Sequence, residues 1–406
     1  MFFVVRRYCV NRKQSVAYTP LSYHFMCRYV NRSYLRIAIV HKKVTICRKK
    51  SYIRLMIVGK FGGSSLCNEK KFARAAAIAK NRKLDCVVVS APRGIDNVTD
   101  LLVKAYFEWV KCGDCGKYFD VVADRFEKIA RPLGVNVTNL LTFVKGEINA
   151  GRSYDYVVSR GEYITAKIMS VVIGYPFCDA TDMIKISGEA DSESTAAHVK
   201  AASFPCVVPG FYGKEPNGNV KLLPRGGSDI TGALIASSLG ALYEKFTDVC
   251  GIFDGYGGVI DRICYSDAKI LAYYGASVLR YEAVDFLQST GCEMRITDGV
   301  SDGTIICGEK YKVKARSKRK MFFASGESCL HAREIGEKGL KIPLLVNALN
   351  RNVMLIDDNG FSQAAIRRIL KYGDQRQVIV TAYIGESDEP FDFDLCDYKL
   401  KIDFCR

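Results

Sequence analysis

Three glycine-containing segments carry the polar side chains best suited to chemistry on a small anion. The first, Lys60-Phe-Gly-Gly-Ser-Ser65, follows an apolar run over residues 55–58. Adjacent glycines after a strand let the main chain approach an anion closely, and the next helix offers free N–H groups. A lysine directly before them can place a positive charge against phosphate oxygens. Taken alone, the segment is also compatible with a structural turn that carries a surface lysine.

The second segment, Leu223-Pro-Arg-Gly-Gly-Ser-Asp-Ile-Thr-Gly232, concentrates a cation, a hydroxyl and a carboxylate within five residues. Arg225 suits a bidentate grip on a substrate carboxylate. Ser228 and Asp229 stand where a helix is expected to begin. An aspartate at such a position also caps helices, so capping is the alternative role for Asp229.

The third segment is Ser159-Arg-Gly-Glu162, which we predict to open another helix. We expect all three segments to lie at strand-to-helix turns. Glu162 at such a turn could hold a substrate ammonium group, whereas a surface salt bridge or a cap is the alternative. A single glycine-rich turn indicates little, but three in one chain are specific.

The elements that must position these segments alternate in the order of an α/β fold. Apolar runs at residues 86–89 and 206–208 predict buried strands, and residues 243–249 also have the character of a strand. Apolar residues at helical spacing follow the first segment, namely Phe72, Ala75, Ala76 and Ala79. We expect two amphipathic helices between about residues 99 and 150. Strand–helix–strand alternation predicts a mainly parallel sheet sandwiched by helices.

The C-terminal part has a different pattern. Seven of the eleven residues 310–320 are Lys or Arg, which predicts a solvated linker, with a binding patch as the alternative. Beyond it the order is strand, helix (328–338), strand, strand, helix (361–371), strand, which is the order of a ferredoxin-like α+β domain. A final edge strand is expected over residues 391–404. The predicted parts are a basic N-terminal extension (1–55), a catalytic domain (56–309) and a C-terminal domain (316–406).

The net charge of +16 is concentrated at the N-terminus. Residues 1–55 hold 13 of the 59 Lys and Arg and none of the 43 Asp and Glu. The body of the chain is therefore nearly balanced, which argues against nucleic acid as its partner. An organelle leader, an over-long start before Met56 and a basic arm are all compatible with residues 1–55.

Two further features bear on the compartment. No run of 18 apolar residues occurs, so we expect no spanning helix and no membrane partner. The 16 cysteines are scattered, apart from Cys112 and Cys115, which predicts free thiols and no zinc site. We therefore expect a cytoplasmic protein, with organelle import if residues 1–55 are a leader.

Taken together, the motifs resemble those of the aspartokinases, within the amino-acid kinase family. The resemblance covers about 250 residues, from Met56 to near Ile306. Besides the three segments, it rests on Val87-Val-Val-Ser-Ala91, Val98-Thr-Asp-Leu101, Pro209-Gly-Phe-Tyr-Gly213, Thr247-Asp-Val249, Gly275-Ala276 with Val278-Leu279, and Gly303-Thr304.

This resemblance implies transfer of the γ-phosphoryl group of ATP, with Mg²⁺, to the β-carboxylate of L-aspartate. By the same resemblance, formation of the product, 4-phospho-L-aspartate, is the first step of lysine, threonine and methionine (diaminopimelate) biosynthesis. By position, the resemblance implies that Lys60 stabilises the transferring phosphoryl group and that Asp229 organises the phosphate and Mg²⁺ region. It assigns the substrate to Thr99, Glu162, Arg225 and Ser228. It assigns the nucleotide to Lys60, Gly62, Gly63, Ser64, Thr247, Asp248 and Phe253.

The chemistry suits that assignment. Phosphoryl transfer needs mainly positioning and neutralisation of developing charge, and a carboxylate nucleophile is already ionised at neutral pH. The chain departs from the family pattern at Pro224, Ser277, Arg280 and residues 254–258. These departures motivate the alternative of a degenerate regulatory homologue that binds aspartate or ATP without turnover.

The C-terminal domain resembles the ACT domains that follow aspartokinase catalytic domains. Relatives usually carry two, and about 90 residues leave room for little more than one. The resemblance implies a homodimer formed through this domain, with feedback control by lysine or threonine. A domain for dimerisation or stability without a ligand is the alternative.

Overall fold

The computed structural model describes residues 54–224, 226–276 and 278–325, and the segments 35–40, 43–48, 345–348, 351–356, 376–385, 393–395 and 398–404. The chain divides into two compact units, Met1–Leu55 and Met56–Arg406. In the first unit β1 (Leu35–Val40) and β2 (Lys43–Arg48) pair antiparallel.

The second unit is built on a seven-stranded sheet. In spatial order its strands are β11 (Arg262–Cys264), β13 (Thr304–Cys307), β12 (Met294–Thr297), β10 (Leu242–Phe246), β3 (Ile57–Phe61), β4 (Cys86–Val89) and β7 (Cys206–Pro209). All neighbours pair parallel except β12 and β13, which are antiparallel. The predicted mainly parallel sheet is therefore confirmed.

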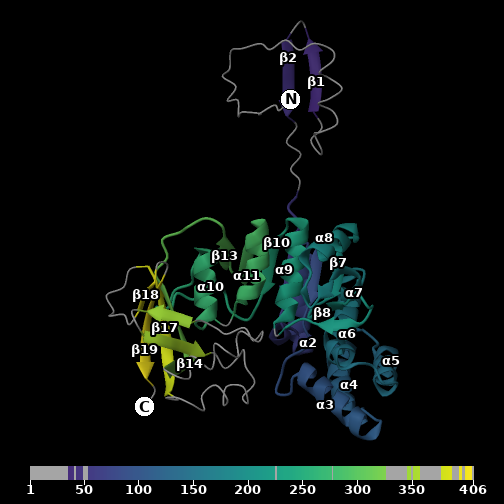
Figure 1. The fold of residues 1–406 in the computed structure, drawn as a ribbon. Helices are drawn as coiled ribbons and strands as arrows, with labels where there is room; N and C mark the ends of the chain where they lie inside the picture. Colours follow the sequence, from purple (N-terminus) through teal and green to yellow (C-terminus); the bar gives the residue numbers. More distant parts are fainter. Residues whose placement is uncertain are drawn as a thin grey trace. The chain divides into compact units, whose positions relative to one another are not determined.

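Helices cover both faces of this sheet (Figure 1). One face carries α2 (Glu69–Asn81), α3 (Val98–Cys112), α4 (Gly116–Ala130), α5 (Thr138–Asn149) and α6 (Tyr154–Ile173). The other carries α7 (Ala180–Met183), α8 (Ser192–Ala201), α9 (Gly227–Leu239), α10 (Tyr265–Tyr273) and α11 (Tyr281–Thr290). Strand side chains alternate between the two cores: Val87 and Val89 join the first, Cys86 and Val88 the second.

Short elements complete the second unit up to residue 309. They are the 3-10 turns η2 (Gly63–Leu66) and η3 (Arg131–Leu133) and the strand pairs β5 (Ile186–Ser187) with β6 (Glu189–Ala190) and β8 (Tyr212–Lys214) with β9 (Val220–Leu222).

The helices follow the residue pattern where that pattern is regular. In α2 the predicted apolar face is buried, and the Asn68 side chain accepts a hydrogen bond from the Lys71 N–H at 2.9 Å, which caps the helix. The prediction of two helices between 99 and 150 is wrong, because three form there. Gly113 (φ 80°) ends α3 and Gly134 (φ 72°) ends η3, so that each glycine separates two helices.

The C-terminal strands form a second, entirely antiparallel sheet. Their spatial order is β15 (Leu345–Ala348), β16 (Arg351–Ile356), β14 (Ala315–Ser325), β17 (Arg376–Ile384), β19 (Tyr398–Phe404) and β18 (Phe393–Leu395). The first four stand in the order 2-3-1-4 of their sequence, which is the strand order of a ferredoxin-like sheet. The helices predicted at 328–338 and 361–371 lie outside the described residues.

Two sequence predictions about this region are wrong. The final segment forms two strands, β18 and β19, instead of one edge strand. The basic run is a linker only as far as residue 314, because β14 begins at Ala315. Ala315 is fully buried and shares a hydrophobic core with Ile384 and the helices of the second face. The main-chain N–H of Arg316 donates to the Asp254 carbonyl oxygen at 2.8 Å.

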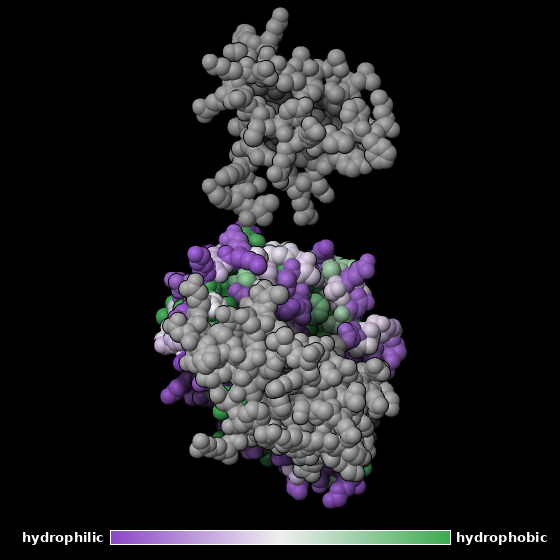
Figure 2. Space-filling view, turned by 60° about the vertical axis from the view of Figure 1, so that its left-hand side comes forward, coloured by the Kyte–Doolittle hydropathy of each residue, from purple (hydrophilic) through white to green (hydrophobic). Residues whose placement is uncertain are grey.

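The described surface is mostly hydrophilic. On the face shown in Figure 2, hydrophilic residues cover most of the described part, and hydrophobic residues are scattered among them. No described helix combines the length and the apolar character needed to cross a bilayer. The described cysteines are free thiols, as predicted.

Candidate functional site

A cavity of about 650 Å³ opens at the carboxyl ends of β3, β4 and β10, where α9 begins. This edge of a parallel sheet is the usual place for a ligand. Most of the predicted site residues lie together in its lining: Lys60, Gly62, Gly63, Ser64, Thr99, Glu162, Ser228, Asp229 and Thr247.

The centre of the cavity floor is a buried cluster of three charges. Lys60 Nζ lies 2.6 Å from Asp229 Oδ1, and Lys245 Nζ lies 2.6 Å from Asp229 Oδ2. None of the three residues is more than 8% exposed. One carboxylate is therefore held between two ammonium groups.

Strand register brings the two lysines together. Lys60 of β3 and Lys245 of β10 are direct partners in parallel strands. Because side chains alternate along a strand, each lysine points to the same face as the residue two positions before it, Val58 or Tyr243. Both of those residues belong to the core that contains α9. Asp229, in the first turn of α9, thus meets both lysines.

The cluster shifts the pKa of its members. Burial raises the pKa of Asp229, but the charges of Lys245 and Lys60 outweigh burial and hold that pKa well below its usual range. Burial lowers the pKa of Lys245 to about 8, against the attraction of Asp229 and together with repulsion from Lys60 and Arg280. The cluster carries a net positive charge while both lysines are protonated.

Glycines allow the main chain to line this cavity closely. A Cβ atom on Gly63 would lie 2.3 Å from the Ala91 carbonyl oxygen, and one on Gly227 would lie 2.7 Å from Leu223 Cβ. Gly226 has φ 87°, which L-residues rarely adopt. α9 starts at the cavity, as the sequence predicted for a helix near Ser228. In its first turn the Asp229 N–H donates to the Gly226 carbonyl oxygen at 2.8 Å, which leaves the earlier N–H groups at the helix start for an anion.

Glu162 reaches the cavity from a different position than predicted. The segment that contains Glu162 does not open a helix; it lies in the interior of α6, and its four residues are buried. Gly161 is required by packing: its Cβ would lie 2.8 Å from Ala91 Cβ and 3.0 Å from Val98 Cγ1. The glycine therefore marks a close helix contact and not a turn.

Only one oxygen of the Glu162 carboxylate has a hydrogen-bond partner among the described residues. Its Oε1 accepts a hydrogen bond from the Ala91 N–H at 3.0 Å. Its Oε2 is buried and has no hydrogen-bond partner among the described residues. Burial raises the pKa of Glu162 to about 7, although the Ala91 hydrogen bond and the charge of Lys60 lower it. Such a carboxylate is suited to receive a cationic group of a ligand.

Two described site residues from the sequence prediction do not line this cavity, and a third cannot be placed. Asp248 lines a small neighbouring cavity and forms an exposed ion pair with Lys71 at 3.5 Å. Phe253 is 49% exposed and lines neither space. Arg225 lies outside the described residues.

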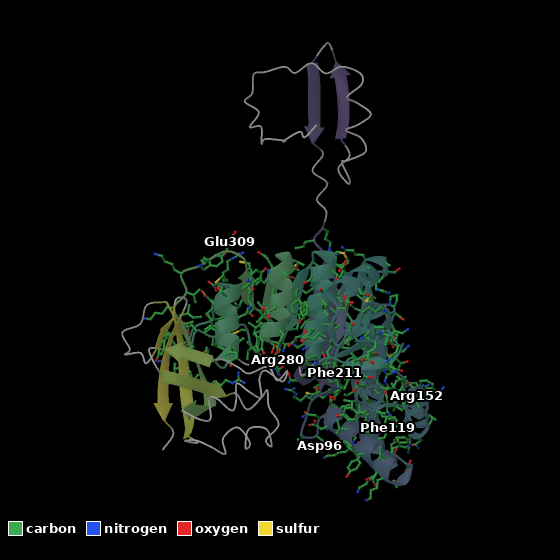
Figure 3. All side chains as sticks on the ribbon, viewed as in Figure 1. Asp96, Phe119, Arg152, Phe211, Arg280 and Glu309 are labelled. Atoms are coloured by element: carbon green, nitrogen blue, oxygen red, sulfur yellow. The ribbon has the colours of Figure 1, made fainter. Side chains whose placement is uncertain are left out.

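The structure adds lining residues that sequence reasoning did not assign to the site. They are Ser90, Ala91, Pro92, Arg93, Asn97, Asp100, Phe211, Leu223, Gly226, Gly227, Lys245, Phe246, Val278 and Arg280. Figure 3 labels Arg280, from the segment before α11, and Phe211, from the turn between β7 and β8. No sequence signal singled out Lys245, because it stands next to another charged residue, Glu244, in β10.

The sequence of this chain is similar to those of known proteins. Residues 56–298 match the amino acid kinase family. Aspartokinase 3 of Bacillus subtilis is 28% identical over 264 residues, which are 56% of this chain and 58% of that protein. The aspartokinase of Pseudomonas aeruginosa is 29% identical over 217 residues, 45% of this chain and 52% of that protein. The chain thus spans little more than half the length of these relatives.

Solved structures show the same fold. The aspartate kinase of Clostridium acetobutylicum superposes with a TM-score of 0.69 at 27% identity, covering 81% of this chain and 87% of that one. E. coli aspartokinase III in complex with aspartate and ADP superposes with a TM-score of 0.68 at 20% identity, covering 86% of this chain and 96% of that one.

Proposed function

Because the chain belongs to the amino acid kinase family, we propose that it transfers the γ-phosphoryl group of ATP to the β-carboxylate of L-aspartate. One observation carries the proposal: a positively charged cluster around Asp229 and the half-satisfied carboxylate of Glu162 line the same cavity. The cluster suits a phosphate chain, and the carboxylate suits an amino acid's ammonium group. The aspartokinase relatives support this choice of substrates.

On the nucleotide side, Lys60 stabilises the negative charge that develops on the transferring phosphoryl group. The N–H groups of Gly62, Gly63 and Ser64 and the start of α9 bind phosphate oxygens. Mg²⁺ usually binds through one or two carboxylates together with substrate phosphates. Asp229 is the carboxylate of the charged cluster, but both of its oxygens contact lysine ammonium groups. It would therefore organise the region of a phosphate-bound Mg²⁺ mainly by orienting Lys60 and Lys245. Thr247 lines the same cavity, whereas Asp248 and Phe253 would serve the nucleotide from its margin.

On the amino-acid side, Glu162 binds the ammonium group through its free oxygen. Arg225 is assigned to a substrate carboxylate from the sequence alone, and Thr99 and Ser228 add hydroxyl donors from the cavity wall. The β-carboxylate of aspartate is ionised at neutral pH and attacks phosphorus without a general base. Positioning and charge neutralisation therefore supply the catalysis.

The C-terminal sheet extends this proposal. Its strand order supports an ACT-like domain. From the resemblance alone, we propose that this domain binds a feedback inhibitor such as lysine or threonine and joins two copies into a homodimer. Such regulation fits an enzyme at the entry to lysine, threonine and methionine biosynthesis. Light scattering of the full chain, with and without each amino acid, tests the dimer.

The decisive experiment traps the acyl phosphate as a hydroxamate. The full chain is incubated with ATP, Mg²⁺ and hydroxylamine, with aspartate, glutamate or UMP as acceptor, while ADP release is followed. We expect product with aspartate alone, and loss of product in Lys60→Met. Folded protein that binds ATP yet gives no product with any acceptor would identify a regulatory homologue without turnover.

A further inference from the structure

We infer that Lys245 is a second phosphate-binding lysine, whose ammonium group contacts the phosphate chain of the nucleotide beside Lys60. The inference deepens the proposed function, on which it rests for the identity of the anion. It starts from a side chain that no motif of the sequence singles out.

Lys245 stands among buried side chains of β10. Its strand neighbour two positions earlier, Tyr243, is fully buried, and the next residue, Phe246, is 2% exposed. Lys245 itself is 8% exposed, yet it lines the cavity. Burial of an ammonium group is costly unless it is compensated. A buried lysine at this position therefore needs an explanation beyond packing.

Neutralisation of Asp229 does not provide that explanation. Lys60 alone, at 2.6 Å, balances the single carboxylate charge. Lys245 adds a second positive charge at the same distance from the other oxygen. Arg280, which lines the same cavity, adds repulsion and helps to lower the pKa of Lys245 to about 8. Among the described residues, the cluster thus has more positive charge than its own carboxylate balances.

An anion in the cavity removes this imbalance. A phosphate chain at the ends of β3 and β10 would meet both ammonium groups, which project side by side from paired positions. Its charge would offset the mutual repulsion of the lysines and hold both of them protonated. The arrangement places a pair of cations where charge develops on a transferring phosphoryl group.

The test compares Lys245→Met with the wild-type full chain by calorimetric titration of ATP and of inorganic tripolyphosphate. Methionine has a similar length without the charge. We expect both ligands to bind at least tenfold more weakly to Lys245→Met, and Lys245→Arg to retain most of the affinity. Lys269→Met is the matched control, because Lys269 forms a partly exposed ion pair with Asp285 on α10 and α11. We expect no change in that control.

Thermal unfolding separates binding from structure. Lys245→Met loses the hydrogen bond to Asp229 Oδ2 but also one of two repelling charges. If Lys245 serves the ligand, the variant remains folded at the temperature of the titration and still binds the ligands more weakly. Unchanged tripolyphosphate affinity in Lys245→Met would overturn the inference, and so would a loss of affinity explained by a lower unfolding temperature.

A variant-free measurement covers the case in which Lys245→Met does not fold. Tripolyphosphate should bind wild type more weakly as the pH rises from 8 to 9, since Lys245 then loses its proton beside Lys60, Asp229 and Arg280, while Glu162 of the same cavity is already mostly ionised at pH 8. A flat profile between pH 8 and 9 contradicts the inference. Lys245-dependent binding without phosphorylation of aspartate would refute the proposed reaction and leave the phosphate role of Lys245 standing.

Discussion

Glu162 and Ala91 are joined by one hydrogen bond, in which the Ala91 N–H donates to Glu162 Oε1 at 3.0 Å. The same two segments touch through Gly161, whose missing Cβ makes room for the Ala91 side chain. The close approach of α6 to the end of β4 therefore fixes one oxygen of the carboxylate. The other oxygen is left for a ligand, and four predictions start from this site.

The affinity for aspartate should depend on the protonation of Glu162. Its pKa in the ligand-free protein is raised to about 7, so the carboxylate is mostly protonated at pH 6 and mostly ionised at pH 8. An ammonium group binds the ionised form. We expect the KM for aspartate to fall as pH rises from 6 to 8, most steeply below pH 7, and to level off above pH 8.

Glu162→Gln is the control for this pH effect. It should raise the KM for aspartate by about 10- to 100-fold at pH 8, the range for loss of a charged hydrogen bond. It should also flatten the dependence of KM on pH. A wild-type KM that is constant between pH 6 and 8 would refute the assignment of Glu162 to the ammonium group.

The free energy of unfolding should also depend on Glu162, but here the protonated carboxyl group is the favoured form. The pKa of Glu162 is raised from 4.5 to about 7 on folding. Between these values the folded protein holds a proton that the unfolded chain has lost, so stability falls as pH rises. The full effect is on the order of 3 kcal/mol. Urea unfolding of Glu162→Gln should show a gain over wild type at pH 8 that largely disappears at pH 5. An equal difference at both pH values would contradict this account.

Removal of the central carboxylate should destabilise the fold. Asp229→Asn leaves Lys60 and Lys245 buried side by side without their counter-charge. We expect a loss of about 3–5 kcal/mol in the free energy of unfolding. The double variant Asp229→Asn/Lys245→Met should recover part of that loss, because one of the two repelling charges is gone.

A surface ion pair provides the comparison for that experiment. Asp285→Asn breaks the contact with Lys269 and should cost less than about 1 kcal/mol. If the double variant at the site is less stable than Asp229→Asn alone, the two lysines do not repel each other as described.

Adjacent glycines in the first segment should respond differently to alanine. A Cβ at Gly63 would meet the Ala91 carbonyl oxygen at 2.3 Å, and a main-chain atom cannot easily move away. A Cβ at Gly62, whose φ is −76°, would find only Lys60 Nζ at 3.9 Å. We expect Gly63→Ala to cost about 1–3 kcal/mol in unfolding free energy, and Gly62→Ala to cost little. Equal thermal midpoints for the two variants would show that the 62–64 turn tolerates a shift.

Much of the fold was predictable because its signals are local. The buried strands at 86–89 and 206–209 are short apolar runs, and the apolar spacing in α2 matches its buried face. The basic run shows a signal that was misread. Basic residues at 310, 312, 314, 316 and 318 alternate with other residues, and from Ala315 onward this two-residue period belongs to a strand.

The remainder of the site depends on contacts between residues far apart in sequence. Lys245 lies beside Lys60 only because β10 pairs with β3 in a register that makes the two residues partners. From the sequence, Gly161 is interpreted as part of a turn at the start of a helix. In the structure it packs against Ala91 from the interior of α6. Neither the register nor the packing partner is contained in a short motif, so residue spacing alone could not reveal them.

The burial of Ala315 in the core of the second face sets a limit on dividing this protein into parts. A chain cut between residues 309 and 315 would expose the apolar surface that Ala315 and Ile384 cover. It would also take away the Arg316 N–H that donates to Asp254 and the Arg319 guanidinium that donates to the Tyr273 carbonyl oxygen at 2.6 Å. An isolated N-terminal fragment ending at 309 should therefore aggregate more readily than the intact chain. For expression trials, the practical consequence is that residues 56–309 should be kept together with strands β14 and β17.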